Sequence, residues 1–154
     1  MTHTAKIEWE RNPEEDFAKG RYSRGHLVIF DGGVSIPGSA SPSVVRPPYS
    51  VQAAADPEEM LIAALSSCHM LTFLDLARRA GFVVDSYIDK AEGGLAKNDH
   101  GRMSLQSVTL RPQILFSGNA PSTEQLADLH HKSHELCFIA NSVNFPVEVA
   151  SATE

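Results

Sequence analysis

The chain contains few cysteines. Only Cys68 and Cys137 occur among its 154 residues. A small secreted domain that depends on disulfides usually carries a larger set of cysteines, so this pair does not predict a disulfide framework. In a reducing compartment, two isolated cysteines are either inert thiols packed in the core or a working redox pair. Composition alone leaves both interpretations open.

Basic residues and long apolar segments are also scarce. Lys and Arg number 13 against 19 Asp and Glu, which gives a net charge of −6. Proteins that bind nucleic acid or anionic lipid usually present a basic face, so neither partner is expected. No run of about 18 apolar residues occurs, and residues 2–20 lack the apolar centre of a signal peptide. We therefore expect a cytoplasmic protein without a membrane-spanning segment.

Several catalytic motifs are absent. There is no Gly-x-Ser-x-Gly elbow and no Gly-x-x-x-x-Gly-Lys phosphate loop, which argues against a hydrolase or a nucleotide-binding enzyme. His130 and His134 are spaced i, i+4, which can chelate a metal from one helix face, and Cys137 follows three residues later. However, the sequence has neither His-Glu-x-x-His nor Cys-x-x-Cys. We predict no metal and no other cofactor.

The length fits a single compact domain, residues 1–154. Alternating or β-branched segments indicate strands, and 3.6-residue patterns with capping residues indicate helices. The expected strands are residues 6–10, 26–30, 83–91, 108–116 and 145–149. Residues 32–48, rich in Pro and Gly, are expected to form a long irregular loop. The order of strands, helix, strands, helix and strand predicts an α+β fold with a largely antiparallel sheet.

The clearest helix is expected from Asp56 to about residue 80. Asp56 is a good N-cap, Pro57 suits the first helical position, and Glu59 completes a variant of the capping box. Gly81 provides the stop signal. Apolar residues cover most of the circumference, so we expect this helix to be buried nearly all round at the centre of the fold.

A second helix is expected to begin after Ser122, with Gln125 at the third position. The helical pattern extends through Cys137 to Ala140 on one apolar face. If that face packs on the first helix, the sulfurs of Cys68 and Cys137 could approach disulfide range. Cys68 lies in the middle of its helix, where the helix dipole is ineffective, so a reactive Cys68 requires an external cation.

Two segments resemble a known family. Residues 56–68 read DPEEMLIAALSSC, and residues 134–137 read HELC, followed by Asn141 and Ser142. Both are similar to segments of the OsmC/Ohr hydroperoxide reductases, in which an Asp-Pro-Glu or Asn-Pro-Glu start precedes the peroxidatic cysteine. The resemblance implies an OsmC-like fold in which an antiparallel sheet wraps around a long central helix. It also implies an intertwined homodimer with active sites at the interface.

The resemblance also implies a reaction. The Cys68 thiolate attacks an organic hydroperoxide and becomes a sulfenic acid, which Cys137 converts into a disulfide. A dithiol, typically a lipoyl group in this family, then reduces that disulfide. Because the helix around Cys68 is nearly apolar, alkyl or fatty-acid peroxides are expected to be better substrates than hydrogen peroxide. The alternative is a dimer that binds a hydrophobic ligand or redox partner with idle thiols.

An Arg–Glu pair holds the reactive sulfur in this family. The resemblance assigns the glutamate to Glu58 and favours Arg24 as the arginine, with Arg46 and Arg21 as alternatives. Glu58 and Cys68 are ten residues apart on one expected helix, a separation of about 15 Å and about 280° of rotation. They cannot touch within one chain, so Glu58 would have to serve the site of a second subunit.

His69 differs from the phenylalanine that is commoner after the peroxidatic cysteine in this family. Because neighbours on a helix diverge by about 100°, His69 is a poor base for Cys68. A hydrogen-bonding role in the core or at an interface is expected instead.

Overall fold

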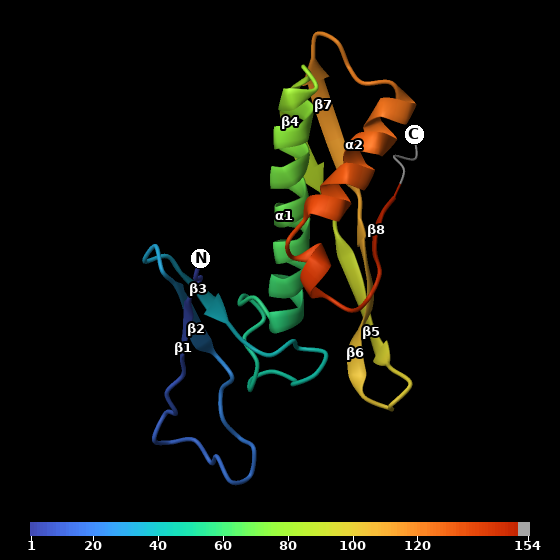
Figure 1. The fold of residues 1–154 in the computed structure, drawn as a ribbon. Coiled ribbons are helices and arrows are strands. Elements are labelled where there is room, and N and C mark those ends of the chain that lie inside the picture. Colours follow the sequence, from blue (N-terminus) through green and yellow to red (C-terminus); the bar gives the residue numbers. More distant parts are fainter. Residues whose placement is uncertain (151–154) are drawn as a thin grey trace. The chain divides into compact units, whose positions relative to one another are not determined.

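The computed structural model describes residues 1–150, and these form two compact units. The first unit is Met1–Met60, and the second begins at Leu61, within the first long helix. Each unit has its own sheets (Figure 1). The organisation of residues 1–154 as a single domain stays a prediction.

The first unit contains a three-stranded antiparallel sheet. Its strands are β1 (Ala5–Glu8), β2 (His26–Phe30) and β3 (Ser35–Gly38), in that order. The strand predicted at residues 26–30 is confirmed. Strand β3 lies in the segment expected to be an irregular loop. This strand was not predicted because it contains Pro37, and proline is disfavoured in central strands. Strand β3 lies at the edge of the sheet, where proline is tolerated.

Helix α1 (Pro57–Arg79) begins and ends at the predicted signals. The Glu59 N–H donates to Asp56 Oδ1 at 2.8 Å, and the Asp56 N–H donates to Glu59 Oε2 at 3.0 Å, so the capping box is present. Gly81 has φ +85°, a backbone conformation that glycine adopts without the cost a side chain imposes. Local sequence signals therefore fix both ends of this helix.

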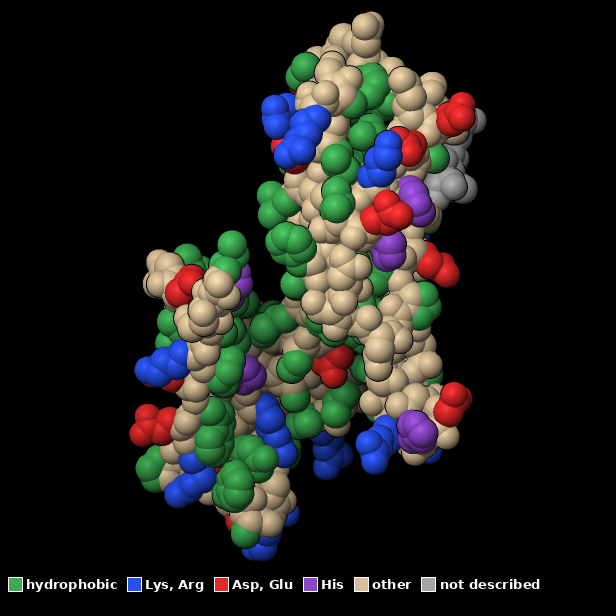
Figure 2. Space-filling model, viewed as in Figure 1, with side chains coloured by type: hydrophobic (Ala, Val, Ile, Leu, Met, Phe, Trp, Pro, Cys, Tyr) green, Lys and Arg blue, Asp and Glu red, His purple; other side chains and the backbone are tan. Residues whose placement is uncertain are grey.

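The expectation that α1 is buried nearly all round is wrong for this chain. Its buried residues form one stripe at four-residue intervals, Leu65, His69, Phe73 and Ala77. Leu71 exposes 61% of its surface, and hydrophobic side chains reach the surface along α1 (Figure 2). The apolar surface of α1 is thus larger than the rest of this chain covers.

Helix α1 is also long and apolar enough to cross a membrane, judged by length and composition alone. An 18-residue window has a mean hydropathy of 1.6. The core helix of a water-soluble protein meets the same criterion, so this property assigns no membrane segment. The expectation that no segment spans a membrane stays a prediction.

The second unit contains two sheets. Strand β4 (Val83–Asp89) pairs with β7 (Pro112–Ser117), and β6 (Met103–Leu110) lies between β5 (Glu92–Lys97) and β8 (Val147–Val149). Only β6 and β8 are parallel among the described pairs. The predicted α+β class with largely antiparallel sheets is confirmed.

The single strand predicted at residues 108–116 is wrong, because the chain changes sheets at Arg111. The Arg111 N–H donates to Asp89 Oδ1 at 2.6 Å, and Pro112 has no N–H to continue a ladder. Strand β5 was missed. Its Gly93 and Gly94 lower the strand signal, yet a Cβ on Gly93 would lie 3.0 Å from Ile62 Cδ1, so α1 packs closely here.

Helix α2 (Thr123–Leu136) has the predicted capping box between Ser122 and Gln125. Phe73 and Ala77 of α1 pack with Leu129 of α2 and with side chains of β4 and β7. Figure 1 accordingly shows α1 and α2 side by side with β4 and β7 behind them. The two helices that carry the cysteine segments therefore share one hydrophobic core.

The prediction that the second helix continues through Cys137 to Ala140 is wrong. Cys137 is the C-cap, with φ −71° and ψ 111°, and a short 3-10 helix, η1 (Ala140–Ser142), follows. The Cys137 thiol accepts a hydrogen bond from the Ala140 N–H at an N···S distance of 3.4 Å. The helix therefore stops where the cysteine turns inward.

Candidate active site

Cys68 lies in the middle of α1 and is half-buried. It is a free thiol rather than part of a disulfide. Its carbonyl accepts a hydrogen bond from Thr72 Oγ1 at 2.9 Å, one turn further along. Since a mid-helix position gains nothing from the helix dipole, a reactive Cys68 still requires a cation from elsewhere.

Cys137 is the buried partner of Cys68. Only 1% of its surface is exposed, and the Cys68 thiol lies close enough to influence its pKa. Burial, followed by the neighbouring Cys68 thiol, raises the pKa of the Cys137 thiol to about 11, against weaker opposing contributions from the backbone N–H groups of η1 and its N-cap. A partly accessible thiol near a buried one is the arrangement that disulfide formation requires.

Arg24 is the most extensively bonded of the three candidate arginines. Its Nη1 donates to Gly20 O at 3.0 Å and to Tyr22 O at 2.5 Å. The guanidinium also stacks 3.8 Å from the centre of the Tyr22 ring. Arg21 and Arg46 are exposed. Among the described residues no carboxylate forms an ion pair with Arg24, so its charge is available to a ligand or a thiolate.

Glu58 lies in the first turn of α1 and is half-buried. It is on the same helix as Cys68, ten residues away, so the two side chains are separated along the axis by about 15 Å. Arg24 and Glu58 belong to the first unit and the cysteines to the second. Placement of the Arg–Glu pair beside Cys68 stays a prediction.

The first unit also carries an aromatic pocket. Trp9, Phe17, Tyr22 and Arg24 line an open cavity of about 340 Å³. The three aromatic rings contact one another, with centroid separations of 4.5 to 6.0 Å. This surface suits an apolar molecule that carries a negative group, because the rings supply apolar area and the guanidinium supplies charge.

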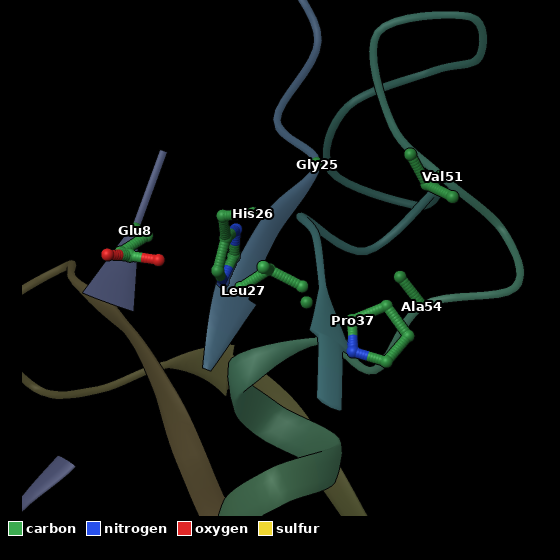
Figure 3. A pocket seen from close by; sticks show the side chains of 8 residues that line it. Glu8, Gly25, His26, Leu27, Pro37, Val51 and Ala54 are labelled. Carbon is green, nitrogen blue, oxygen red and sulfur yellow. The ribbon is translucent and has the colours of Figure 1, made fainter. Parts of the chain in front are cut away.

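A second open pocket of about 330 Å³ lies on the sheet of the same unit (Figure 3). His26 stands there on β2, where its register partner is Gly38 of β3. A Cβ on Gly38 would lie 2.4 Å from His26 Nε2, so the absence of a side chain makes room for the imidazole. His26 Nδ1 is 2.8 Å from Arg24 O, which ties the pocket wall to the backbone of the arginine.

The predicted hydrogen-bonding role of His69 is confirmed. His69 exposes only 1% of its surface, and its Nε2 lies 3.0 Å from His130 Nδ1 on α2. His134, one turn after His130, has a buried Nδ1 without a hydrogen-bond partner among the described residues. No group of three or more His, Cys, Asp or Glu within residues 1–150 has the geometry to hold a metal.

Sequence reasoning missed two polar side chains of β4, Asp89 near His130 and Tyr87 against Phe73. Asp89 accepts a hydrogen bond from Ser66 Oγ at 2.5 Å, and its negative charge raises the pKa of His130 while burial lowers it more. The Tyr87 hydroxyl is buried without a partner in the described structure, and burial, then Asp89, raises its pKa. The alternation of β4 would have indicated only which side chains face inward.

Acid is expected to destabilise the fold through His69. Burial, followed by the charges of His130 and His134, lowers the pKa of His69 from 6.5 to about 4. Its neutral form therefore stabilises the fold fully above pH 6.5, and this contribution is lost as the pH falls toward 4. Between about pH 7 and about pH 4.5 the loss is about 2 kcal/mol.

Urea unfolding at both pH values measures this loss. His69→Gln should show a smaller decrease in the free energy of unfolding than the wild type, because glutamine does not titrate. His131→Gln is the matched control, since the His131 side chain is 71% exposed. If the wild type and His69→Gln lose equal stability, His69 does not account for the acid sensitivity.

The structure is thus a small α+β protein with two free thiols, one half-buried and one buried. A family model described as OsmC-like protein matches residues 50–151. The chain therefore belongs to the OsmC-like family. Among curated proteins, none matches the chain.

Solved structures agree with this assignment. An OsmC-like protein of unknown function from Vibrio cholerae shares 50% sequence identity, covers 97% of this chain and 98% of that chain, and has a TM-score of 0.95. An organic hydroperoxide resistance protein from Elizabethkingia anophelis shares 20% identity, with 97% and 92% of the chains covered and a TM-score of 0.71. The organic hydroperoxide resistance protein OhrB of Bacillus subtilis shares 17% identity, with 97% and 96% covered and a TM-score of 0.65. At these lower identities the likeness concerns the fold.

Proposed function

We propose that this protein is a thiol-dependent peroxidase that reduces organic hydroperoxides. The observation that carries the proposal is a pair of free thiols, half-buried Cys68 and buried Cys137, that lie close enough to influence each other's ionisation. Membership of the OsmC-like family supports it, because that fold is shared with organic hydroperoxide resistance proteins. A pair of inert core thiols would need no such proximity, since either cysteine could pack against apolar side chains alone.

The reaction divides between the two sulfurs. The Cys68 thiolate attacks the O–O bond, so that Cys68 becomes a sulfenic acid and the alkoxide takes up a proton to leave as an alcohol. The Cys137 sulfur then forms a bond to the Cys68 sulfur, and the hydroxyl leaves with the Cys137 proton as water. A dithiol donates two electrons and two protons to restore both thiols.

The environments of the two thiols favour these roles. Cys137 is buried, and its raised pKa keeps it a thiol at neutral pH. Cys68 is half-buried and is the sulfur that a peroxide can reach. The accessible thiol therefore reacts first and the buried thiol resolves the product, since the nucleophile must be both ionised and accessible.

Arg24 and Glu58 complete the proposed site from a second subunit. The free charge of Arg24 suits stabilisation of a thiolate, and Glu58 suits orientation of that arginine. The homodimer is supported by the exposed apolar surface of α1, including Leu71, because a soluble chain buries such a surface against a partner. A second copy of the chain is the partner that the intertwined family arrangement implies.

A mixed dimer tests the shared site. One subunit carries Glu58→Gln and the other carries Cys68→Ser, each with a different affinity tag so that the hybrid can be purified. If each site takes Cys68 and Glu58 from different subunits, the hybrid keeps one complete site and about half of the wild-type activity. Both parent homodimers should have low activity. A hybrid no more active than its parents would contradict the shared site.

The proposed reductant is a dithiol of the lipoyl type, and the proposed location is the cytoplasm. Reduced lipoamide and cumene hydroperoxide test the activity together, with hydrogen peroxide as a second substrate. We expect rapid consumption of the organic peroxide and slower consumption of hydrogen peroxide, because the helix that carries Cys68 is largely apolar. Equal rates would remove the preference but not the activity.

A second candidate function is binding of an apolar ligand or redox partner without turnover. The open aromatic pocket of the first unit favours it, since Trp9 and Phe17 expose 41% and 54% of their surfaces. The same assay separates the two functions. A folded protein that consumes no hydroperoxide with any dithiol would support binding alone.

A further inference from the structure

The imidazoles of His69 and His130 form a directional contact between α1 and α2. The contact is the 3.0 Å approach of His69 Nε2 to His130 Nδ1, and the two rings are nearly parallel, with centroids 5.3 Å apart. The His130 ring also stacks on Phe73, with centroids 4.6 Å apart. His130 thus lies against two successive turns of α1.

The contact requires at least one ring nitrogen without a proton, because an N···N hydrogen bond joins one N–H to one lone pair. Burial lowers the pKa of both imidazoles. The other titratable groups that act on them are His134 on α2, which lowers the pKa of His69, and Asp89 on β4, which raises that of His130. At neutral pH both rings are therefore uncharged, and the hydrogen bond is intact.

Each histidine of the contact lies on the same helix segment as one of the two cysteines. His69 directly follows Cys68 on α1, and His130 lies two turns before Cys137, the C-cap of α2. Apolar packing between helices is not directional, whereas a hydrogen bond has a preferred distance and angle. Disulfide formation tolerates little displacement, because the two Cα atoms must lie about 4.4 to 6.8 Å apart. A contact that fixes the register of α2 on α1 thereby fixes Cys137 at Cys68.

We propose that His69 and His130 are positioning residues for the resolving step, holding Cys137 where its sulfur can attack the Cys68 sulfur. This inference rests on the proposed function for its biological role. The positioning itself concerns only the step in which the Cys137 sulfur attacks the Cys68 sulfur and the group bonded to that sulfur departs. In the peroxidase reaction the group is hydroxyl, which leaves as water.

Ellman's reagent tests the positioning without any peroxide. The Cys68 thiolate attacks the reagent, forms a mixed disulfide and releases one thionitrobenzoate. Cys137 then attacks the Cys68 sulfur and releases the second thionitrobenzoate. Stopped-flow absorbance separates these two phases. The second phase reports how well Cys137 is held, and it is independent of whether the protein reduces hydroperoxides.

Three variants and a control define the expected result. His69→Leu and His130→Phe remove the hydrogen bond, and the phenylalanine retains an aromatic ring for Phe73. Both should slow the second phase about tenfold and leave the first phase within about threefold. His69→Gln should keep most of the wild-type rate of the second phase, because the glutamine amide can reach the position of the histidine Nε2. The exposed His131→Gln should react as the wild type does.

The opposite results would overturn the proposal. A second phase of wild-type rate in either His69→Leu or His130→Phe, with circular dichroism showing a folded protein, would mean that the contact does not position Cys137. Equal slowing of both phases would mean that the pair only stabilises the fold. Failure of the peroxidase assay with a normal second phase in the wild type would reject the proposed function and leave the positioning intact.

Discussion

Replacing Cys68 by serine is expected to reduce hydroperoxide consumption by about 10³-fold or more, because removal of the attacking nucleophile eliminates the covalent route. Serine has nearly the size of cysteine, but its hydroxyl neither ionises near neutral pH nor cycles through a sulfenic acid. The measurement is consumption of cumene hydroperoxide with excess reduced lipoamide. The effect should appear as loss of turnover with an unchanged circular dichroism spectrum.

The matched control is Ser67→Ala. Ser67 is exposed and precedes Cys68 on α1, so its replacement alters the same helix without removing a thiol. It should retain wild-type turnover. Residual activity of Cys68→Ser comparable to the control would show that the reaction does not pass through Cys68, and attention would move to Cys137 or to a non-thiol mechanism.

Replacing Cys137 by serine is expected to leave the first chemical step intact and to stop the second. Cys68 should consume one equivalent of hydroperoxide per chain and then remain as a sulfenic acid, because the sulfur that displaces the hydroxyl is missing. A peroxide assay at protein concentrations comparable to the substrate measures this burst. Dimedone, which reacts with sulfenic acids, should label Cys68 in this variant and much less in the wild type.

An added small monothiol distinguishes a lost resolving step from a damaged site. It can attack the Cys68 sulfenic acid from solvent, since Cys68 is half-buried rather than enclosed. Turnover of Cys137→Ser should therefore resume when the monothiol is supplied. Continued turnover in its absence, at the wild-type rate, would contradict the role assigned to the buried thiol.

Short-range signals were sufficient to predict the starts of both helices and the end of α1. Asp56 and Glu59 bond to each other's backbone N–H groups as the sequence predicts, and Gly81 ends the helix in a left-handed conformation. Ser122 and Gln125 cap α2 in the same way. Such contacts involve neighbours in the chain, so their residue types carry the information.

Features that depend on distant segments could not be predicted. The break at Arg111 depends on a hydrogen bond to Asp89, 22 residues earlier. The end of α2 at Leu136 depends on how Cys137 is buried against the rest of the second unit. Helical periodicity extends past that point in the sequence, so a pattern alone predicts too long a helix.

The candidate site shows the same division. The sequence pointed to both cysteines, and their approach was conditional on the packing of two helices, which the second unit shows. It also indicated a hydrogen-bonding role for His69, but it could not name His130 as the partner 61 residues away. The sequence left the choice among three arginines open. The structure shows that Arg24 donates to backbone carbonyls, whereas Arg21 and Arg46 are exposed.

The most direct measurement is the fate of the two thiols after one equivalent of cumene hydroperoxide. Reduced protein is mixed with the peroxide, denatured in an alkylating agent, digested and examined by mass spectrometry. The account predicts a peptide pair joined through Cys68 and Cys137, with both thiols protected from alkylation and the peroxide converted to its alcohol. Two fully alkylated cysteines and unconsumed peroxide, in a protein that is folded and reduced at the start, would contradict it.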